Sequence, residues 1–322
     1  MILILSNKYD LSVDYVVRLL SKKGKKFLRI NTESLLNSKV SVSFPRFNYK
    51  IERRCSCFDL ADKFKSVWFR RPGKPFEFDD QEKLPGPSVV AFVENQWHAF
   101  IEGLKSISNL FWVNNPDDNH TTENKILQLN MAQRIGLRIP KTCITNDKGE
   151  ALQFLKDCDG EIVAKALYLP LIEEDKADYF IFANVVDTIE NVPEHEFRLA
   201  PTIFQEHLRD KKDYRLTIIG DRCFSVEVVR ESVKGTITDW RIIKEGIRFR
   251  PCELPSDVVA KCVELVKAFG LTFGAIDLVQ TLDDYYFLEI NPNGEWAWLQ
   301  KEAKLPIAES LVNVLTQGGL EA

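Results

Sequence analysis

The sequence predicts a three-lobed protein of mixed α/β and α+β class, with an N-terminal α/β lobe, a small central α+β lobe and a C-terminal α+β lobe. The chain has 322 residues, enough for about two domains or three smaller lobes that share interfaces. It opens on a β-α-β pattern, which is typical of a parallel sheet. Its last third places strands around one amphipathic helix, which favours an α+β lobe.

The first lobe is expected to cover residues 1–115. Ile2–Leu5 is apolar throughout, as in a buried strand, and Ser12–Ser21 places its apolar residues at helical spacing. Lys26–Ile30 then completes the β-α-β unit. The remaining expected elements are a strand at Lys65–Arg70, a long helix at Val89–Ser106 and a short strand at Phe111–Val113, after which Asn114-Asn115-Pro116 ends the lobe.

The central lobe is expected at 116–201 and the C-terminal lobe at 202–322. The central elements are a helix at Thr121–Ile135 and strands at Glu161–Ala166 and Tyr179–Val186, joined by a hairpin connection. The third group of strands begins at Thr202–His207 and continues through Asp213–Ile219, Arg222–Val229, Phe273–Gln280 and Tyr286–Asn291. Ser256 is predicted to cap an amphipathic helix that ends before Gly270.

Composition and charge exclude several functional classes. The chain is 45% hydrophobic and 28% charged, with a net charge of −4, so it lacks the basic stripe expected of a nucleic-acid-binding protein. No apolar run approaches the ~20 residues that span a bilayer, and the N-terminus lacks the basic region of a signal peptide. Seven scattered cysteines are typical of thiols in a reducing cytosol. We therefore expect a cytoplasmic protein without nucleic-acid or membrane partners.

Three polar residues stand out in the last two predicted strands. Asp277 interrupts an apolar strand, while Glu289 and Asn291 point to one face of the next. If the connecting turn has an odd effective length, Asp277 and Glu289 lie opposite each other, where like charges repel. A hard cation would remove that penalty, and carboxylate and amide oxygens suit Mg²⁺. The alternative is that both acids flank a hydrated sheet edge.

Several cations could accompany such a metal. Magnesium with few protein ligands usually shares its coordination shell with phosphates, which cationic side chains could bind. Lys165 is one candidate, because it lies within an otherwise apolar strand. Lys125 occupies the first turns of the helix after Pro116. Arg215 alternates with apolar residues along its strand and could face a polar cleft, and Arg241 could reach that cleft. The alternative is that each is a surface residue, as single lysines and arginines more often are.

A break after a strand could supply a base pocket. Gln205, Glu206, His207 and Leu208 end a predicted strand, and exposed backbone there could contact an adenine edge. An ordinary strand end is the alternative interpretation. The chain contains neither a GxGxxG nor a Walker A motif, so neither a Rossmann nor a P-loop site is supported.

Together these residues resemble the ATP-grasp superfamily of carboxylate–amine ligases. The motifs are NKILQL with Lys125, GLRIPKT, VAKA with Lys165, the Gln205-Glu206 hinge, a DYR strand with Asp213 and Arg215, and the set Asp277, Glu289 and Asn291. The resemblance covers essentially the whole chain. It implies an ATP-grasp fold with an N-terminal pre-ATP-grasp lobe, two lysines and an arginine on ATP phosphates, an adenine-binding hinge and two Mg²⁺ ions on the acidic set. Asp213 either joins the ATP site or orients Arg215.

Within the superfamily the chain is most similar to the graspetide, or microviridin-type, ligases. The motifs are VWFRRP, TDWR, LEINPNGEWAWLQ and LPIAESL. The resemblance implies a homodimeric ligase that forms ω-ester or ω-amide cross-links in a ribosomal precursor peptide with a leader and an acidic core containing Thr, Ser or Lys. It also implies leader docking on the hairpin at Leu169–Tyr179, with Glu173, Glu174 and Asp175 as candidates, although an ordinary exposed hairpin is the alternative.

The resemblance implies residue roles and leaves other functions open. Arg215 and Arg241 would stabilise the phosphate and the acyl phosphate, whereas Arg70 and Arg71 either face the substrate cleft or form structural salt bridges. Trp296 and Trp298 either pack the turn or line the acceptor cleft. A ligase that appends an amino acid such as glutamate is an alternative, but LYLPLIEEDKADYF lacks the glycines of its phosphate-covering loop. A non-catalytic nucleotide-binding regulator is a third, disfavoured by the intact acids and lysines.

Overall fold

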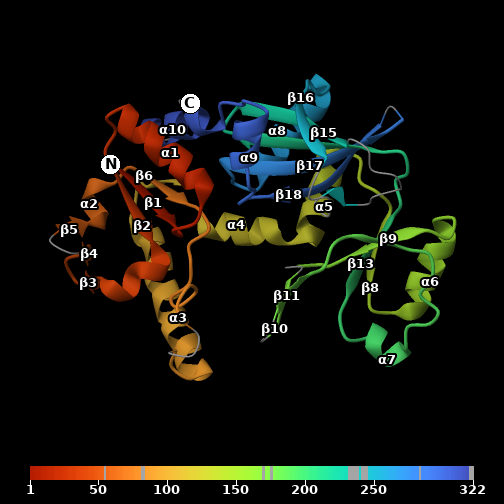
Figure 1. Cartoon of the computed structure of the whole chain (residues 1–322), viewed down its shortest axis with the longest axis horizontal. Helices are drawn as coiled ribbons and strands as arrows, with labels where there is room; N and C mark the ends of the chain where they lie inside the picture. Colours follow the sequence, from red (N-terminus) through yellow and green to blue (C-terminus); the bar gives the residue numbers. More distant parts are fainter. Residues whose placement is uncertain are drawn as a thin grey trace.

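The computed structural model describes residues 1–53, 56–80, 84–168, 171–174, 177–230, 239–240, 246–282 and 284–318. Within these residues the strands form five β-sheets. Figure 1 shows the red-orange N-terminal lobe packed beside the blue-teal C-terminal lobe, while most of the green central lobe extends away from both. The combination of a parallel sheet with antiparallel sheets confirms the predicted α/β and α+β class.

The first lobe contains the predicted β-α-β unit. Its four-stranded parallel sheet has the order β2-β1-β6-β7, and a three-stranded sheet of order β3-β4-β5 lies beside it. The elements are β1 (Ile2–Ser6), α1 (Leu11–Lys22), β2 (Phe27–Asn31), η1 (Thr32–Asn37), β3 (Lys39–Ser43), β4 (Asn48–Arg53), β5 (Ser56–Asp59), α2 (Leu60–Lys63), β6 (Ser66–Phe69), α3 (Pro87–Glu102), η3 (Gly103–Ser106) and β7 (Phe111–Val113).

The central lobe is an antiparallel sheet of order β12-β9-β13-β8 together with the β10–β11 pair. Its elements are α4 (Pro116–Glu123), α5 (Lys125–Ile135), β8 (Thr142–Thr145), α6 (Lys148–Asp157), β9 (Ile162–Lys165), β10 (Leu171–Glu174), β11 (Ala177–Phe180), β12 (Asn184–Val186), α7 (Glu194–Phe197) and β13 (Thr202–Glu206). The antiparallel β10–β11 pair confirms the expected hairpin in its described part.

Three predictions for this region were wrong. The helix expected at Thr121–Ile135 is two helices, because Asn124 adopts extended backbone geometry and its side chain caps the second. The strand expected at Tyr179–Val186 is divided between two sheets. The strand at Thr202–His207 pairs with β8 and β9 and so does not begin the third group of strands. We therefore propose that the last domain boundary lies after Glu206.

The C-terminal lobe is built on an antiparallel sheet of order β16-β15-β14-β17-β18. Its elements are β14 (Lys212–Ile219), β15 (Arg222–Arg230), β16 (Ile247–Pro251), α8 (Ser256–Ala268), β17 (Phe273–Thr281), β18 (Asp284–Asn291), α9 (Ala297–Glu302) and α10 (Ile307–Gln317). Ser256 is the first residue of α8 and Pro255 is its N-cap, so the predicted serine cap was wrong.

The two faces of this sheet have different environments. Leu216, Ile276 and Ile290 lie on the face packed against α5 and α8 through residues such as Leu129 and Leu265. The opposite face joins the first lobe in one core that includes Ile4, Val16, Trp68, Ala275, Trp296 and Leu311. Because neighbouring strand residues point to opposite faces, Arg215, Asp277 and Glu289 lie on this second face, beside the contact between the lobes.

Two further observations concern the whole described chain. No helix in the ranges above combines the length and the apolar character needed to cross a bilayer. The cysteines that the structure describes are all free thiols, as the scattered sequence positions predicted.

Candidate active site

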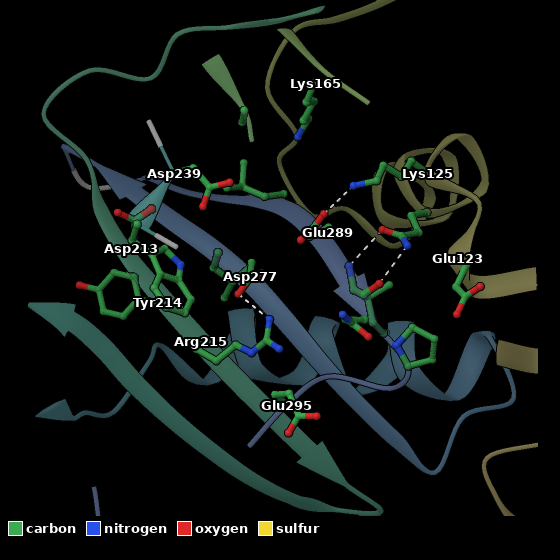
Figure 2. Close-up of a pocket in the computed structure, with 18 of the residues that line it drawn as sticks. Glu123, Lys125, Lys165, Asp213, Tyr214, Arg215, Asp239, Asp277, Glu289 and Glu295 are labelled. Atoms are coloured by element: carbon green, nitrogen blue, oxygen red, sulfur yellow. Dashed lines mark hydrogen bonds and ion pairs between the residues drawn. The ribbon is translucent and has the colours of Figure 1, made fainter. Parts of the chain in front are cut away.

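A cleft of about 610 Å³ lies over the second face of the C-terminal sheet (Figure 2). Many of its lining residues are charged. The charged residues of the cleft, among those described, are Arg71, Glu123, Lys125, Lys165, Lys211, Asp213, Arg215, Asp239, Asp277, Glu289 and Glu295. Three lobes therefore contribute charged residues to one cleft, which places cations and carboxylates within reach of the same ligand.

An opposed pair of carboxylates lies at the centre of the cleft. Asp277 on β17 and Glu289 on β18 are cross-strand partners, and a register shift follows directly after Asp277. The expectation that these residues lie opposite each other is confirmed. Asn291 continues the same face, opposite Ala275. The donor set that the sequence predicted for a hard cation is thus brought together on one face.

Each carboxylate is paired with a cation from another element. Arg215 Nη1 lies 2.8 Å from Asp277 Oδ1, and Lys125 Nζ lies 2.7 Å from Glu289 Oε2. The Asp277 and Glu289 side chains are 12% and 17% exposed, so both charges are largely removed from water. Two carboxylates this close and this buried require compensating charge. In this structure Arg215 and Lys125 supply the compensating positive charge. A bound divalent cation would supply the same charge, and the carboxylate oxygens that would coordinate it are already in place.

The described lining of the cleft offers carboxylate and amide oxygens but no His or Cys side chain, so it fits an oxygen-liganded cation better than a nitrogen- or sulfur-liganded one. No cluster of three or more His, Cys, Asp and Glu side chains suited to a metal occurs among the described residues. A metal in this cleft would therefore use the Asp277–Glu289 pair with the Asn291 amide, leaving further positions for phosphate or water oxygens. That composition is typical of Mg²⁺.

Gln128 on α5 is a site residue that sequence reasoning missed. Its Nε2 donates to Ile290 O at 2.9 Å and to Thr122 O at 2.6 Å, and its Oε1 accepts from Ile290 N at 3.0 Å. β18 is an edge strand, so the N–H and C=O of Ile290 on its outer side have no neighbouring strand to pair with. The buried amide of Gln128 forms both hydrogen bonds in place of such a strand. Its position three residues after Lys125 on one helix was the available signal.

Lys165 and Asp213 line the cleft at its upper part (Figure 2). Lys165 ends β9 and projects from the central lobe toward the side of the cleft that holds Lys125. Asp213 forms ion pairs with Lys211 and Arg230. Its ion-pair partners are therefore other residues than Arg215, and it stays a prediction that Asp213 joins the ATP site or orients Arg215.

The two neighbouring arginines of the first lobe have different environments. Arg71 lines the cleft and pairs with Glu295, and its φ of 45° is strained for a non-glycine residue. Arg70 is 2% exposed, is bound to Asp10 and Glu295, and is absent from the described lining. Of the two alternatives stated for these arginines, Arg70 follows the structural salt bridge, so its place in the substrate cleft was wrong. Arg71 both lines the cleft and forms a salt bridge. Arg241 lies outside the described residues.

The predicted hinge lies at the end of β13 and does not line the described cleft. Gln205 Nε2 donates to Thr142 Oγ1 at 2.9 Å, and Glu206 Oε1 accepts from Lys141 N at 2.9 Å. His207 Nδ1 lies 2.5 Å from Glu161 Oε2, and this hydrogen bond is the largest cause of the lowered pKa of Glu161. Leu208 is half-buried. Adenine binding by this segment stays a prediction.

The two tryptophans of the turn have separate roles. Trp296 is fully buried in the core that joins the first and third lobes, so it packs the turn. Trp298 is half-buried, lines the cleft, and lies against Trp240 and Phe249 with ring centroids 5.8 and 4.1 Å apart. Of the candidate leader contacts, Glu173 and Glu174 belong to β10, and Asp175 lies outside the described residues.

Glu123 and Tyr168 form a further part of the cleft that sequence reasoning missed. Burial raises the pKa of Glu123, and the Tyr168 hydroxyl donates to its Oε2 at 3.4 Å. Burial likewise raises the pKa of Tyr168. A carboxyl group with a raised pKa in a cleft is a feature of functional sites as well as of structural pairs.

Comparisons with known proteins were made over the whole chain. A RiPP-associated ATP-grasp ligase from Chryseobacterium gregarium, solved with ADP and a leader and core peptide, is 28% identical, with a TM-score of 0.87 over 99% of this chain and 97% of that chain. The macrocyclase MdnC from Microcystis aeruginosa, solved with the precursor peptide MdnA, is 27% identical, with a TM-score of 0.86 over 99% of this chain and 100% of that chain.

One curated relative matches in sequence. The tetrahydromethanopterin:α-L-glutamate ligase of Methanocaldococcus jannaschii is 24% identical over 251 residues, which cover 70% of this chain and 78% of the relative. No protein-family model matches the chain. These likenesses confirm the expected ATP-grasp fold, the expected enzyme class of an ATP-grasp ligase and the similarity to graspetide macrocyclases.

Proposed function

We propose that this chain uses ATP and Mg²⁺ to activate side-chain carboxylates of a ribosomal precursor peptide as acyl phosphates, and that it forms intramolecular ω-ester or ω-amide cross-links. The observation that carries the proposal is the cleft in which Asp277 and Glu289 oppose each other with Arg215 and Lys125 on their oxygens. The two peptide-bound ligases that match nearly the whole chain support a peptide as the substrate.

The residues of the cleft divide into three functions. Asp277, Glu289 and Asn291 would hold Mg²⁺, which would neutralise charge on the transferred phosphate. Lys125 and Arg215 would exchange their carboxylate partners for phosphate oxygens, and Lys165 would bind phosphate oxygens beside them. Arg71 faces the same cleft from the first lobe and would bind the substrate carboxylate.

The reaction proceeds in two steps. A carboxylate oxygen of the peptide attacks the γ-phosphorus, the bond to the β-phosphate oxygen breaks, and ADP leaves with that electron pair. A hydroxyl or amine of the peptide then attacks the acyl carbon, phosphate leaves with one oxygen of the original carboxylate, and the nucleophile releases its proton to solvent. Such transfers depend mainly on positioning and electrostatic stabilisation, which the cations and carboxylates of the cleft would provide.

Addition of an amino acid to a protein or metabolite is the second candidate. The similarity to a glutamate ligase favours it. That match covers less of the chain, however, and has a lower identity than the matches to the two peptide-bound ligases. Their similarity over nearly the full length makes peptide cross-linking the better-supported activity.

Mass spectrometry of an acidic peptide that contains Thr, Ser or Lys, incubated with the protein, ATP and Mg²⁺, tests the proposal. We expect the peptide to lose the mass of one water per cross-link, with one ADP released for each. Gain of an amino-acid residue when free amino acids are present would support the second candidate. Absence of both a mass change and ADP release, with a leader-bearing precursor encoded beside the gene, would contradict both.

Three broader expectations stay predictions. The composition predicts a cytoplasmic protein. The resemblance implies a homodimer, and light scattering of the purified protein would measure its mass in solution. The resemblance also implies leader docking on the β10–β11 hairpin. Deletion of residues 171–180 should weaken binding of a leader peptide more than binding of ADP.

A further inference from the structure

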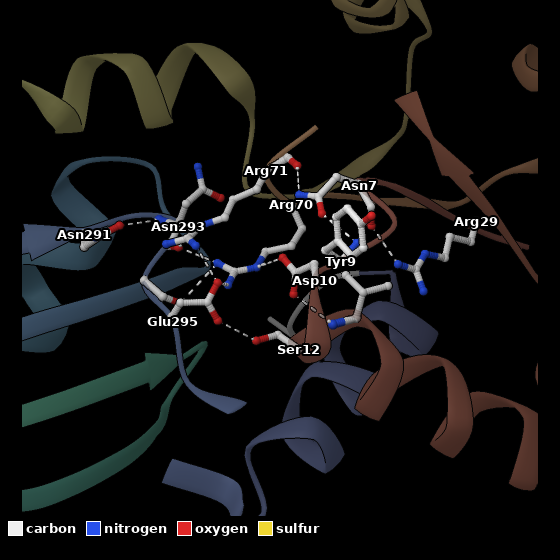
Figure 3. A network of polar contacts seen from close by, with 12 residues as sticks. Asn7, Tyr9, Asp10, Ser12, Arg29, Arg70, Arg71, Asn291, Asn293 and Glu295 are labelled. Atoms are coloured by element: carbon white, nitrogen blue, oxygen red, sulfur yellow. Dashed lines mark hydrogen bonds and ion pairs between the residues drawn. The ribbon is translucent and has the colours of Figure 1, made fainter. Parts of the chain in front are cut away.

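The loop that follows Asn291 is held through its backbone by the first lobe (Figure 3). Asn114 Nδ2 donates to Pro292 O at 3.0 Å. Arg70 Nη1 donates to the next two carbonyls, those of Asn293 and Gly294, the latter at 3.1 Å. Successive carbonyls of one loop are thus bound by two buried side chains from another lobe, an arrangement that fixes the loop closely.

The other side of this loop contacts the proposed metal and phosphate residues. Asn293 N donates to Asn291 Oδ1 at 3.0 Å, and Asn293 O accepts from Arg70, so the backbone of one residue links Arg70 to the side chain of Asn291. Gly294 lies directly against Arg215, because a Cβ added to it would lie 2.7 Å from Arg215 Nη2. The loop therefore fills the space between Arg70 and Arg215, and its position limits where Asn291 and Arg215 can lie.

Arg70 is held in place by two carboxylates as well as by its bonds to the loop. Its Nε lies 2.9 Å from Asp10 Oδ2, and its Nη2 lies 2.8 Å from Glu295 Oε1. Burial lowers the pKa of Arg70, and the two carboxylates oppose that effect. Asp10 is itself fixed, because its other oxygen accepts from Val13 N at the start of α1. A guanidinium can contact two carboxylates and two carbonyls at once, which the single ammonium of lysine cannot.

We propose that Arg70 is a positioning residue for the ligation reaction: through the Asn293–Gly294 backbone it sets the places of Asn291 and Arg215 in the cleft. Asn114 supports the same loop at Pro292. The inference rests on the proposed function of the cleft. It explains why a buried arginine of the first lobe is bonded to the loop that follows the predicted metal ligands. Partners of this kind orient ligands without touching substrate.

Arg70→Gln and Arg70→Lys test the inference, with Ser66→Ala as the matched control. Ser66 Oγ donates to Leu315 O at 2.7 Å, so the control removes a buried bond between the same lobes that does not involve the loop. For each variant we would measure thermal stability without ligand, the affinity for ADP with and without Mg²⁺, and the kcat and KM for the peptide.

Arg70→Gln should weaken Mg²⁺-dependent ADP binding about tenfold or more and lower kcat by a similar factor, while KM for the peptide changes less than kcat. Arg70→Lys should recover part of both losses, because it keeps the charge beside Asp10. Ser66→Ala should lower thermal stability and leave Mg²⁺-dependent ADP binding unchanged. If Arg70→Gln cannot be obtained folded, Arg70→Lys carries the same test.

If the folded Arg70 variants bind ADP as tightly as Ser66→Ala does, with the same dependence on Mg²⁺, the inference is overturned. The two proposals fail separately. A wild-type protein that binds ADP with Mg²⁺ yet leaves the peptide unchanged would contradict peptide ligation, and the ADP measurement would still decide the role of Arg70.

Discussion

Replacement of Gln128 by leucine should both destabilise the protein and weaken nucleotide binding at the proposed site. Leucine has nearly the volume of glutamine but can form none of the three hydrogen bonds to Thr122 and Ile290. Ile290 is 2% exposed, so water cannot readily replace the lost partner of its N–H. The variant separates the hydrogen bonding of Gln128 from its packing.

The hydrogen-bond geometry sets the expected magnitude. An unsatisfied buried N–H costs about 1–3 kcal/mol, and loss of each of the two carbonyl bonds costs about 1 kcal/mol. Burial of the leucine side chain returns about 1–2 kcal/mol. The free energy of unfolding should therefore fall by about 1–4 kcal/mol, because the three losses exceed the apolar gain. Mg²⁺-dependent ADP binding should weaken as well, since Glu289 and Asn291 flank Ile290.

Urea denaturation followed by circular dichroism, together with calorimetric titration of ADP, would measure both effects. Gln133→Leu is the control, because Gln133 lies on the same helix and is exposed. A Gln128→Leu variant that unfolds within about 0.5 kcal/mol of the wild type, as surface substitutions usually do, would refute the idea that this amide supports the edge of β18.

Three further predictions address other parts of the cleft. Glu289→Gln should abolish turnover and leave the circular dichroism spectrum unchanged, because it removes the charge proposed to bind the metal without a change of volume; wild-type turnover would refute the metal assignment. Gly294→Ala should also lower kcat strongly, since its Cβ would lie 2.4 Å from Ala275 Cβ and 2.7 Å from Arg215 Nη2, and overpacking of this kind costs about 1–3 kcal/mol; normal kcat in that variant would contradict the close contact. The pKa of Glu123 is raised by burial, so the folded protein holds this proton more tightly than the unfolded chain and gains stability as pH falls through the folded pKa. Glu123→Gln should therefore be more stable than the wild type at neutral pH and lose that advantage in acid, as denaturation across pH would show; an advantage that grows in acid would contradict this sign.

Strand alternation explains why part of the cleft geometry could be predicted from the sequence. Asp277, Glu289 and Asn291 could be assigned to one face because side chains alternate strictly along a strand. The opposition of the two acids followed from the pairing of neighbouring strands, which is the commonest connection. The fold class was predictable for the same reason, since the β-α-β start and the later strands have different local patterns.

Long-range pairing and local capping account for the errors. The assignment of Thr202–Glu206 to the third lobe failed because sheet partners distant in sequence leave no local pattern, and this strand pairs with β8 and β9. Asn124 is a cap within a continuous helical pattern, and its signal was present but was not used. The bonds of Asn114 and Arg70 to the loop after Asn291 join two lobes, and the VWFRRP motif that contains Arg70 does not identify those partners.

The central claim is that a side-chain carboxylate of the peptide is activated by ATP in the cleft that contains Asp277 and Glu289. Transfer of heavy oxygen tests it most directly. A substrate peptide whose Asp and Glu side chains carry heavy oxygen would be incubated with the protein, ATP and Mg²⁺, and the released phosphate analysed by mass spectrometry. The acyl-phosphate mechanism predicts one labelled oxygen in the phosphate for every cross-link formed. Cross-linked peptide accompanied by unlabelled phosphate would contradict it.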